Sequence, residues 1–230
     1  MCGRFTNQIT WRELVELYEI HDQPALNLRP RYNVAPSQDI PIVRPVPVED
    51  EEDEDAPREV VMARWGLVPF WAKDLKVGYK MINAKAETVD EKPAFRNAFK
   101  RRRCLIPADG FYEWKKLDKK EKQPYRLCLP EQRAFAFAGL WEANDKLEVT
   151  SCTIITTEPN AVAAEIHDRM PVILPPEAYA GWLSQATPPE EAKALLKPYA
   201  GEMIAYPVDK AVGSPKNDGP ELIEEAAKDA

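Results

Sequence analysis

The sequence of 230 residues has few features of metalloproteins, membrane proteins or nucleotide-binding enzymes. It contains two histidines, and its four cysteines show no CxxC pairing or zinc-ligand spacing, so no metal site is expected. No apolar run approaches a membrane span, and the N-terminus lacks a basic-then-apolar signal pattern. We expect no membrane association, and a cytoplasmic protein if the source is bacterial or a nuclear one if it is eukaryotic.

Phosphate-binding glycine motifs and an excess of positive charge are also missing. Neither GxGxxG nor a P-loop occurs, so no cofactor is expected. The formal net charge of −7 argues against a protein that coats DNA regardless of sequence. The acid is concentrated, however, in the run EDEEDED from Glu49 to Asp55. Residues 49–57 therefore predict an exposed acidic loop, and a local basic groove elsewhere remains compatible with the composition.

The rest of the chain predicts a folded protein built from many short strands. An apolar share of 44% supports a core, and strand-like segments follow one another through hairpin turns. Thr10 and Glu13 form a capping box before an apolar stripe, which predicts a helix. We expect a single domain over residues 1–230, of α+β class, with a curved, barrel-like, mainly antiparallel mixed sheet and flanking short helices. Because no apolar helix face is left over, we expect a monomer.

The cysteines fall into two kinds. Cys104, Cys128 and Cys152 lie in apolar, strand-like segments, which predicts buried free thiols. Cys2 instead becomes the N-terminal residue if Met1 is removed. It then carries an amine and a thiol on adjacent carbons, a pair that condenses with an aldehyde to an imine and then to a thiazolidine ring. The α-amine has a pKa of about 7.7–8.0, so part of it is nucleophilic near neutral pH. The alternative is an incidental residue in a frayed terminus.

Three further stretches place polar residues among aromatic and turn residues: MINAKAET, ADGFYEW and EIHDRMP. Glu113 lies in the aromatic strand FYEW, where an inward orientation would raise its pKa and suit it to acid–base chemistry. His167 is suited to proton transfer near neutral pH, and Asn83 to orienting an aldehyde or sugar hydroxyl. The alternatives are a solvent-facing Glu113, a structural His167 and turn chemistry at Asn83.

A second group of residues suits nucleic-acid binding. Arg4 and Lys85 can contact phosphates, and Phe70 and Trp71 can form a stacking platform for bases. The basic run at residues 100–103 has a simpler explanation as a solvated charged face.

Together these motifs resemble the SOS response-associated peptidase (SRAP) family of abasic-site-processing proteins. The resemblance spans almost the whole chain in the right order, and it rests on these segments: MCGRF, RYNVAPSQ, RWGLVPFW, INAKAET, RRRCLIPADGFYEWKK, IHDRMPVIL and AVGSPKND. It implies the SRAP fold and a groove for single-stranded DNA that contains abasic sites. It also implies that Met1 is removed, in part through the protein's own peptidase activity.

By motif match, the resemblance implies four catalytic residues. Cys2 forms a thiazolidine with the ring-opened aldehyde of an abasic site, Asn83 holds the opened sugar, and Glu113 and His167 transfer protons. The DNA-binding residues implied by the same match are Arg4, Pro36, Phe70, Trp71, Lys85 and Arg169. Lys85 departs from the commoner Arg of the motif, so it keeps the charge and loses the bidentate phosphate contact.

Three functions remain open from the sequence. The leading one is a protein that crosslinks itself to abasic sites in single-stranded DNA and so shields them from strand cleavage. The second is a thiol hydrolase of the N-terminal-nucleophile type, in which Cys2 attacks a peptide or amide. The third is a non-covalent reader of modified DNA bases.

Overall fold

The computed structural model describes residues 2–46, 56–118 and 121–226. It confirms the predicted α+β class with a barrel-like sheet and short helices. Most of the predicted acidic loop at residues 49–57, and Met1 with it, lies outside the described residues. Along the described ranges, no helix combines the length and the apolar character needed to cross a membrane.

A closed five-stranded barrel forms one half of the molecule. Strand β10 pairs with both β9 and β4, and the circle is completed through β3 and β6. All of these pairings are antiparallel except β10–β4. The barrel strands are β3 (Asp39–Pro45), β4 (Arg58–Trp65), β6 (Arg103–Ala108), β9 (Phe135–Asn144) and β10 (Val149–Thr157). Three short strands attach to its rim: β5 (Asn83–Lys85), β11 (Met170–Pro171) and β12 (Ile173–Leu174).

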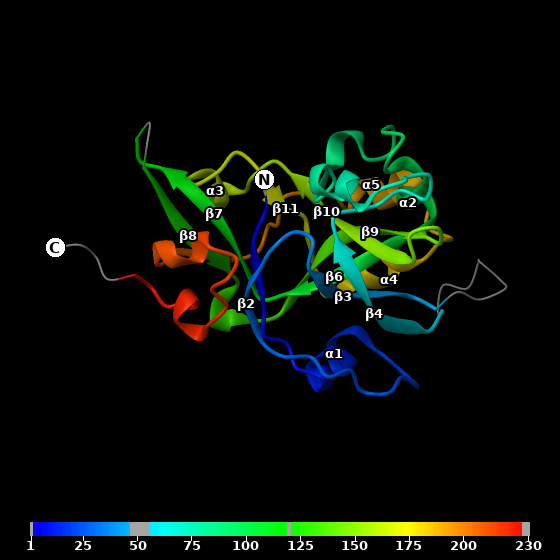
Figure 1. Ribbon diagram of the computed structural model, residues 1–230, viewed down its shortest axis with the longest axis horizontal. Helices are drawn as coiled ribbons and strands as arrows, with labels where there is room; N and C mark the ends of the chain where they lie inside the picture. The colour runs from blue at the N-terminus through cyan, green and yellow to red at the C-terminus, as the bar shows by residue number, and fades with distance from the viewer. Residues whose placement is uncertain (1, 47–55, 119–120, 227–230) are drawn as a thin grey trace.

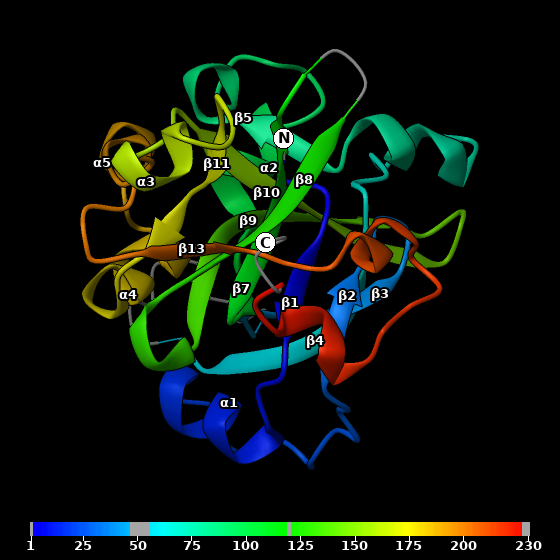
Figure 2. The ribbon, with the colours of Figure 1, turned by 90° about the vertical axis from the view of Figure 1, so that its left-hand side faces the viewer.

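A five-stranded antiparallel sheet forms the other half, on the left in Figure 1. Its order is β13 (Ile204–Pro207), β8 (Lys122–Cys128), β7 (Gly110–Lys116), β1 (Phe5–Asn7) and β2 (Arg31–Val34). A single residue, Asp109, separates β6 of the barrel from β7 of this sheet. The C-terminal segment runs across the outside of the sheet (Figure 2). The N-terminal strand β1 is thus an inner strand of the sheet next to the barrel.

Short helices flank the barrel and the sheet. They are α1 (Trp11–Tyr18), α2 (Arg96–Arg101), α3 (Ala161–Ala164), α4 (Tyr179–Leu183) and α5 (Pro189–Ala194). Short 3-10 turns include η1 (Leu75–Lys80) and η2 (Ala86–Thr88). The predicted capping box is present, because the Thr10 hydroxyl accepts a hydrogen bond from the Glu13 amide and the Glu13 carboxylate accepts one from the Thr10 amide. Helix α1 buries Leu14 and Tyr18 against the barrel core.

The core between the sheet and the barrel is aromatic. Phe5 is fully buried, with its ring centroid 5.2 Å from Trp65 and 5.7 Å from Phe137. Burying such a side chain contributes about 1.5–3 kcal/mol to folding, so Phe5 fixes the N-terminal strand against the barrel. The thiols of Cys104, Cys128 and Cys152 are buried and free, as predicted.

Candidate active site

The N-terminal strand is held beside β7, and this pairing determines the position of Cys2. Phe5 pairs with Phe111, and the Tyr112 amide donates to the Arg4 carbonyl at 3.0 Å. Continued toward the N-terminus, this antiparallel register places residue 3 alongside Glu113. The Cys2 side chain is fully buried. Burial raises the pKa of the Cys2 thiol, and the nearby Glu113 carboxylate raises it further.

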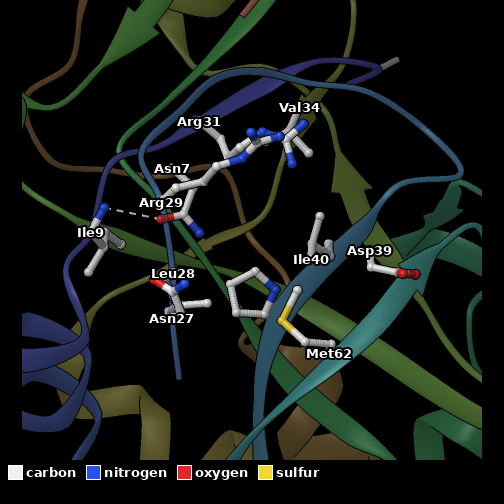
Figure 3. Close-up of a pocket in the computed structure, with 11 residues that line it drawn as sticks. Asn7, Ile9, Asn27, Leu28, Arg29, Arg31, Val34, Asp39, Ile40 and Met62 are labelled. Carbon is white, nitrogen blue, oxygen red and sulfur yellow. Dashed lines mark hydrogen bonds between the residues drawn. The ribbon is translucent and has the colours of Figure 1, made fainter. Parts of the chain in front are cut away.

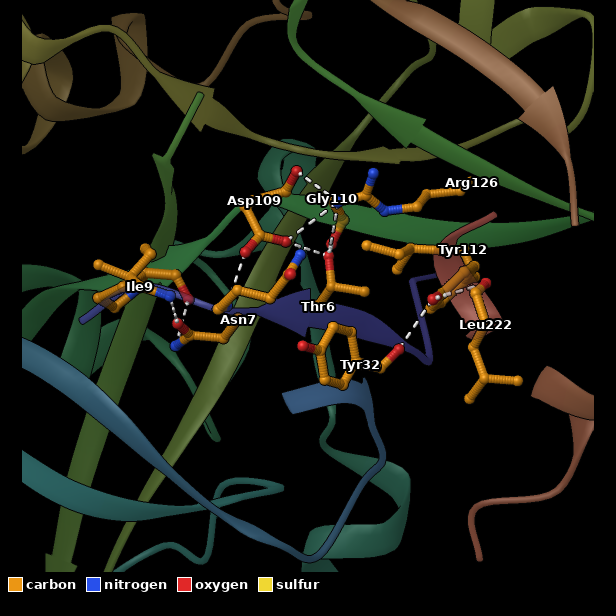
Figure 4. A network of polar contacts seen from close by, with 12 residues as sticks. Thr6, Asn7, Ile9, Tyr32, Asp109, Gly110, Tyr112, Arg126 and Leu222 are labelled. Carbon is orange, nitrogen blue, oxygen red and sulfur yellow. Dashed lines mark hydrogen bonds and ion pairs between the residues drawn. The ribbon is translucent and has the colours of Figure 1, made fainter. Parts of the chain in front are cut away.

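A buried polar network ties β1 to the β6–β7 junction (Figure 4). The Thr6 hydroxyl donates to the Asp109 carboxylate, whose second oxygen accepts from the Gln8 amide at 2.6 Å. Arg126, fully buried on β8, donates to the same carboxylate at 3.2 Å and to Thr6 at 3.3 Å. A Cβ at Gly110 would lie 2.7 Å from the Arg126 Nε atom, so a larger residue here would have to displace the buried Arg126 side chain. The network therefore fixes the strand that carries Cys2.

Glu113 is the acidic group of the site. Its side chain lies on β7 and is only 4% exposed, which settles the inward orientation. Burial raises its pKa to about 7, because the carboxylate form loses its hydration. A carboxyl group with this pKa can both give and take a proton at neutral pH.

His167 lies within reach of Glu113. Its Nε2 atom is 3.8 Å from the Glu113 Oε2 atom. Its Nδ1 atom accepts a hydrogen bond from the Arg169 amide at 3.0 Å. Burial lowers the pKa of His167, so the neutral imidazole predominates near pH 7. The Nδ1 atom also lies 3.0 Å from the Asp168 Oδ1 atom, whereas Nε2 faces the Glu113 carboxyl group.

Asn83 lies on β5, which pairs in parallel with β10 at Ile154. Its amide nitrogen donates to the Ile82 carbonyl at 2.9 Å. Its Oδ1 atom is buried and accepts no hydrogen bond from any described residue. A buried acceptor without a donor is costly unless a ligand supplies one. Within the described ranges, the Asn83 side chain forms no hydrogen bond with Cys2, Glu113 or His167.

Some of the predicted DNA-binding residues are exposed to solvent, and others form hydrogen bonds or ion pairs within the protein. Phe70 and Trp71 are 57% and 53% exposed, and Lys85 is exposed on β5. Pro36 is half-buried in the turn between β2 and β3. Asn144 fixes the aromatic pair, because its buried amide donates to the carbonyls of Pro69 and Ala72 at 2.8 and 3.1 Å. The aromatic faces are thus presented to solvent on a fixed turn.

Both predicted DNA-binding arginines have partners within the protein. Arg169 forms a two-pronged pair with Glu87, at 2.5 and 3.0 Å, and donates to the Thr156 carbonyl at 2.7 Å. Arg4 donates to the Asn33 side chain at 2.9 Å and to the carbonyls of residues 212 and 213 at 2.6 and 3.0 Å. A DNA contact by either guanidinium stays a prediction, and Arg4 also links the N-terminal segment to the C-terminal one.

Several residues that hold the site residues in position were not predicted from the sequence. Asp109, Arg126, Asn33, Asn144 and Glu87 are buried or paired around the predicted site residues. Asp109 and Glu87 lie inside motifs that already attracted attention, ADGFYEW and INAKAET. Asn33 lies in the segment RYNVAPSQ, whereas no local signal marks Arg126 and Asn144, because their partners are distant in the sequence.

A separate pocket contains none of the predicted site residues (Figure 3). It lies between the segment around Asn27 to Arg29 and strands β3 and β4, where Met62 is 45% exposed.

As for metals, no group of three His, Cys, Asp or Glu side chains within residues 2–46, 56–118 and 121–226 could hold an ion.

Comparison with known proteins matches these features to one family. The model of the family "SOS response associated peptidase (SRAP)" matches residues 1–215. "Abasic site processing protein YoqW" of Bacillus subtilis is 48% identical over 97% of this chain and 99% of its own length. "Abasic site processing protein HMCES" of Xenopus tropicalis is 33% identical over 85% of this chain and 66% of its own length.

The fold is likewise shared with a solved structure. A crystal structure of a protein from Bacteroides thetaiotaomicron superposes with a TM-score of 0.83 at 25% identity, covering 98% of this chain and 100% of that one. The family match and the relatives cover nearly every motif that surrounds Cys2, Glu113 and His167. The chain belongs to the SOS response associated peptidase (SRAP) family.

Proposed function

We propose that this protein processes abasic sites by linking Cys2 covalently to the abasic aldehyde in single-stranded DNA. The observation that carries the proposal is the position of Glu113, whose buried carboxyl group lies beside both Cys2 and His167. The relatives that share 33–48% identity are named abasic site processing proteins. The exposed pair Phe70 and Trp71 supports a single strand as the partner, because unpaired bases stack on aromatic side chains.

The reaction begins at the α-amine that Met1 removal would release on Cys2. The neutral amine adds to the aldehyde carbon and gives a carbinolamine, which loses water to form an imine. The Cys2 sulfur then adds to the imine carbon, the thiol proton leaves, and the nitrogen gains a proton. The product is a five-membered thiazolidine, and no oxidant or cofactor is consumed.

Each proton transfer has a group suited to it. Glu113, with its pKa near 7, can protonate the sugar oxygen as the ring opens and then accept the thiol proton of Cys2. His167 presents its Nε2 atom to the same carboxyl group and can relay a proton. The unpartnered Oδ1 atom of Asn83 can accept a hydrogen bond from a hydroxyl of the opened sugar.

Ring closure has a protective consequence. An imine at the abasic carbon permits β-elimination and strand scission, whereas the thiazolidine removes the imine. The crosslink therefore shields the site. Removal of Met1 by the protein itself would use the same Cys2 thiol and Glu113 carboxyl group, which accounts for the peptidase name of the family.

The test uses purified protein and a single-stranded oligonucleotide with one abasic site. Wild type should form a heat-stable crosslink, and Cys2→Ala should form none. Cys2→Ala and Cys2→Ser both keep the α-amine, so each should give an imine that borohydride traps and more strand cleavage, without the heat-stable thiazolidine. Intact-protein mass should show loss of Met1, and a variant with an added residue before Cys2 should not crosslink.

A crosslink that persists undiminished in Cys2→Ala would rule out the thiazolidine. Equal affinity for intact and abasic strands, with no covalent product, would indicate the non-covalent reader instead. Hydrolysis of a peptide or amide without any crosslink would indicate the thiol hydrolase.

A further inference from the structure

A hollow lined by lysines adjoins the candidate active site at Asn83. It lies between the end of η1, strand β5 and the start of α2, and Lys80, Asn83, Lys85, Lys92 and Phe95 contribute to its walls. We call it the lysine hollow. We infer that the lysine hollow binds phosphate groups of the DNA strand on one side of the abasic nucleotide, with Lys80 and Lys92 as phosphate-binding residues. This inference rests on the proposed function.

The charge of the hollow is unbalanced, in contrast to its surroundings. Nearby cations are neutralised: Arg169 pairs with Glu87, and Lys193 pairs with both oxygens of Asp90 at 2.6 and 2.7 Å. Within the part of the chain that the structure describes, Lys80 and Lys92 form no salt bridge, whereas the Lys85 charge interacts with the Glu87 carboxylate beyond salt-bridge distance. Three ammonium groups around one hollow, without carboxylates on its walls, attract a polyanion.

The backbone of the hollow is fixed. The Lys92 amide donates to the Thr88 carbonyl at 3.0 Å, and the Lys92 carbonyl accepts from the amides of Phe95 and Arg96 at 2.9 Å each. On the opposite wall, the Met81 amide donates to the Gly78 carbonyl at 2.9 Å. The lysine side chains are exposed and free to adjust, so a fixed frame presents three mobile charges.

The size and position of the hollow favour phosphates of a strand over an enclosed ligand. Its volume of about 260 Å³ falls below the roughly 300–1,000 Å³ of pockets that enclose drug-sized molecules. Asn83, the predicted sugar-binding residue, forms part of its wall. A strand whose abasic sugar lies at Asn83 must continue in both directions, and one flank would cross this hollow.

The experiment measures non-covalent binding with Cys2→Ala protein and a single strand that carries a tetrahydrofuran abasic analogue. Log Kd is followed against log salt for the parent and for Lys80→Gln, Lys92→Gln and the double variant. The slope should fall by about 0.7 for each lysine that neutralises a phosphate of a single strand. Arg12→Gln is the charge-matched control, because α1 lies at the opposite end of the molecule from β5 (Figure 2). Its slope should equal that of the parent.

Strands with the analogue at the centre, the 5′ end or the 3′ end locate the contact. The lysine effect should persist with the central analogue and with only one of the terminal ones. An unchanged slope in the double variant, or an equal loss with both terminal strands, would overturn the inference. Crosslinking by wild type is scored separately, so failure of the proposed function is distinguished from failure of the lysine hollow.

Discussion

The Nε2 atom of His167 lies 3.8 Å from the Oε2 atom of Glu113, and burial favours the uncharged form of both side chains. The Glu113 carboxyl group has a raised pKa of about 7, while the pKa of the imidazole is lowered. The two side chains come from β7 and from the loop after α3, more than fifty residues apart. Their pairing gives the site a proton donor and a proton acceptor in the pH range where an N-terminal amine becomes nucleophilic.

Glu113→Gln should slow crosslinking and remove one limb of its pH profile. Wild-type rates should rise with pH up to about 7 as the α-amine loses its proton, level off between the two pKa values, and fall above about pH 8 because Glu113 has lost the proton that it donates. General acid–base catalysis contributes roughly 10²–10⁴-fold, so we expect a loss in that range and no fall on the alkaline side. Single-turnover crosslinking rates at saturating DNA between pH 5 and 9 provide the measurement. A variant that retains the alkaline fall would exclude Glu113 as the acid.

The same substitution should change the pH dependence of stability. Because the folded-state pKa of Glu113 is raised, folding favours the protonated acid, and this advantage is present below pH 4.5 and lost as pH rises through about 7. The shift from 4.5 to about 7 corresponds to roughly 3 kcal/mol. In urea unfolding at several pH values, the free energy of unfolding of Glu113→Gln should therefore rise relative to that of wild type, by up to that amount, between pH 5 and 8. The exposed Glu158→Gln should keep a constant offset from wild type.

Asp109→Ala should destabilise the protein strongly. It leaves the fully buried Arg126 without its carboxylate and removes the acceptor of Thr6 and of the Gln8 amide. Breaking a buried ion pair costs about 3–5 kcal/mol, measurable as the free energy of unfolding in urea. Asp145→Ala, in an exposed turn, serves as the control and should stay within about 0.5 kcal/mol. A small effect at Asp109 would mean that the network does not fix β1.

Trp71→Ala should weaken DNA binding without changing stability. The side chain is 53% exposed, so its removal takes little from the core. Stacking on one base is worth about 1–3 kcal/mol, which corresponds to roughly 5- to 150-fold in Kd. Fluorescence anisotropy with the Cys2→Ala protein and an abasic-analogue strand gives the affinity. Met62→Ala, an exposed apolar residue at the separate pocket, should bind like the parent.

Arg4→Lys separates two possible contributions of Arg4. Lysine keeps the charge but cannot reproduce the three hydrogen bonds to Asn33 and to the carbonyls of residues 212 and 213. We expect a loss of about 1–3 kcal/mol in unfolding free energy and an unchanged salt dependence of DNA binding. Unchanged stability would show that the link between the two ends of the chain is weak.

Features that depend on neighbouring residues could be predicted from the sequence. The capping box at Thr10 and Glu13 is a local hydrogen-bond exchange, and it is present in α1. The aromatic neighbours of Glu113 in FYEW indicated an inward carboxyl group as one of two orientations, and the side chain is buried on the same strand face as Phe111. The chemistry of Cys2 follows from its covalent structure alone.

The tertiary structure alone decided which distant groups meet. The parallel pairing of β10 with β4 closes the barrel, and no pattern within either strand specifies that partner. Arg4 meets a carbonyl 208 residues away, and Arg169 meets Glu87 across 82 residues. Such contacts form only when the whole core packs, since their stabilisation must offset the loop entropy between the partners. The sequence therefore determined the reactive groups and the local elements, whereas packing of the complete chain determined their neighbours, their burial and so their pKa values.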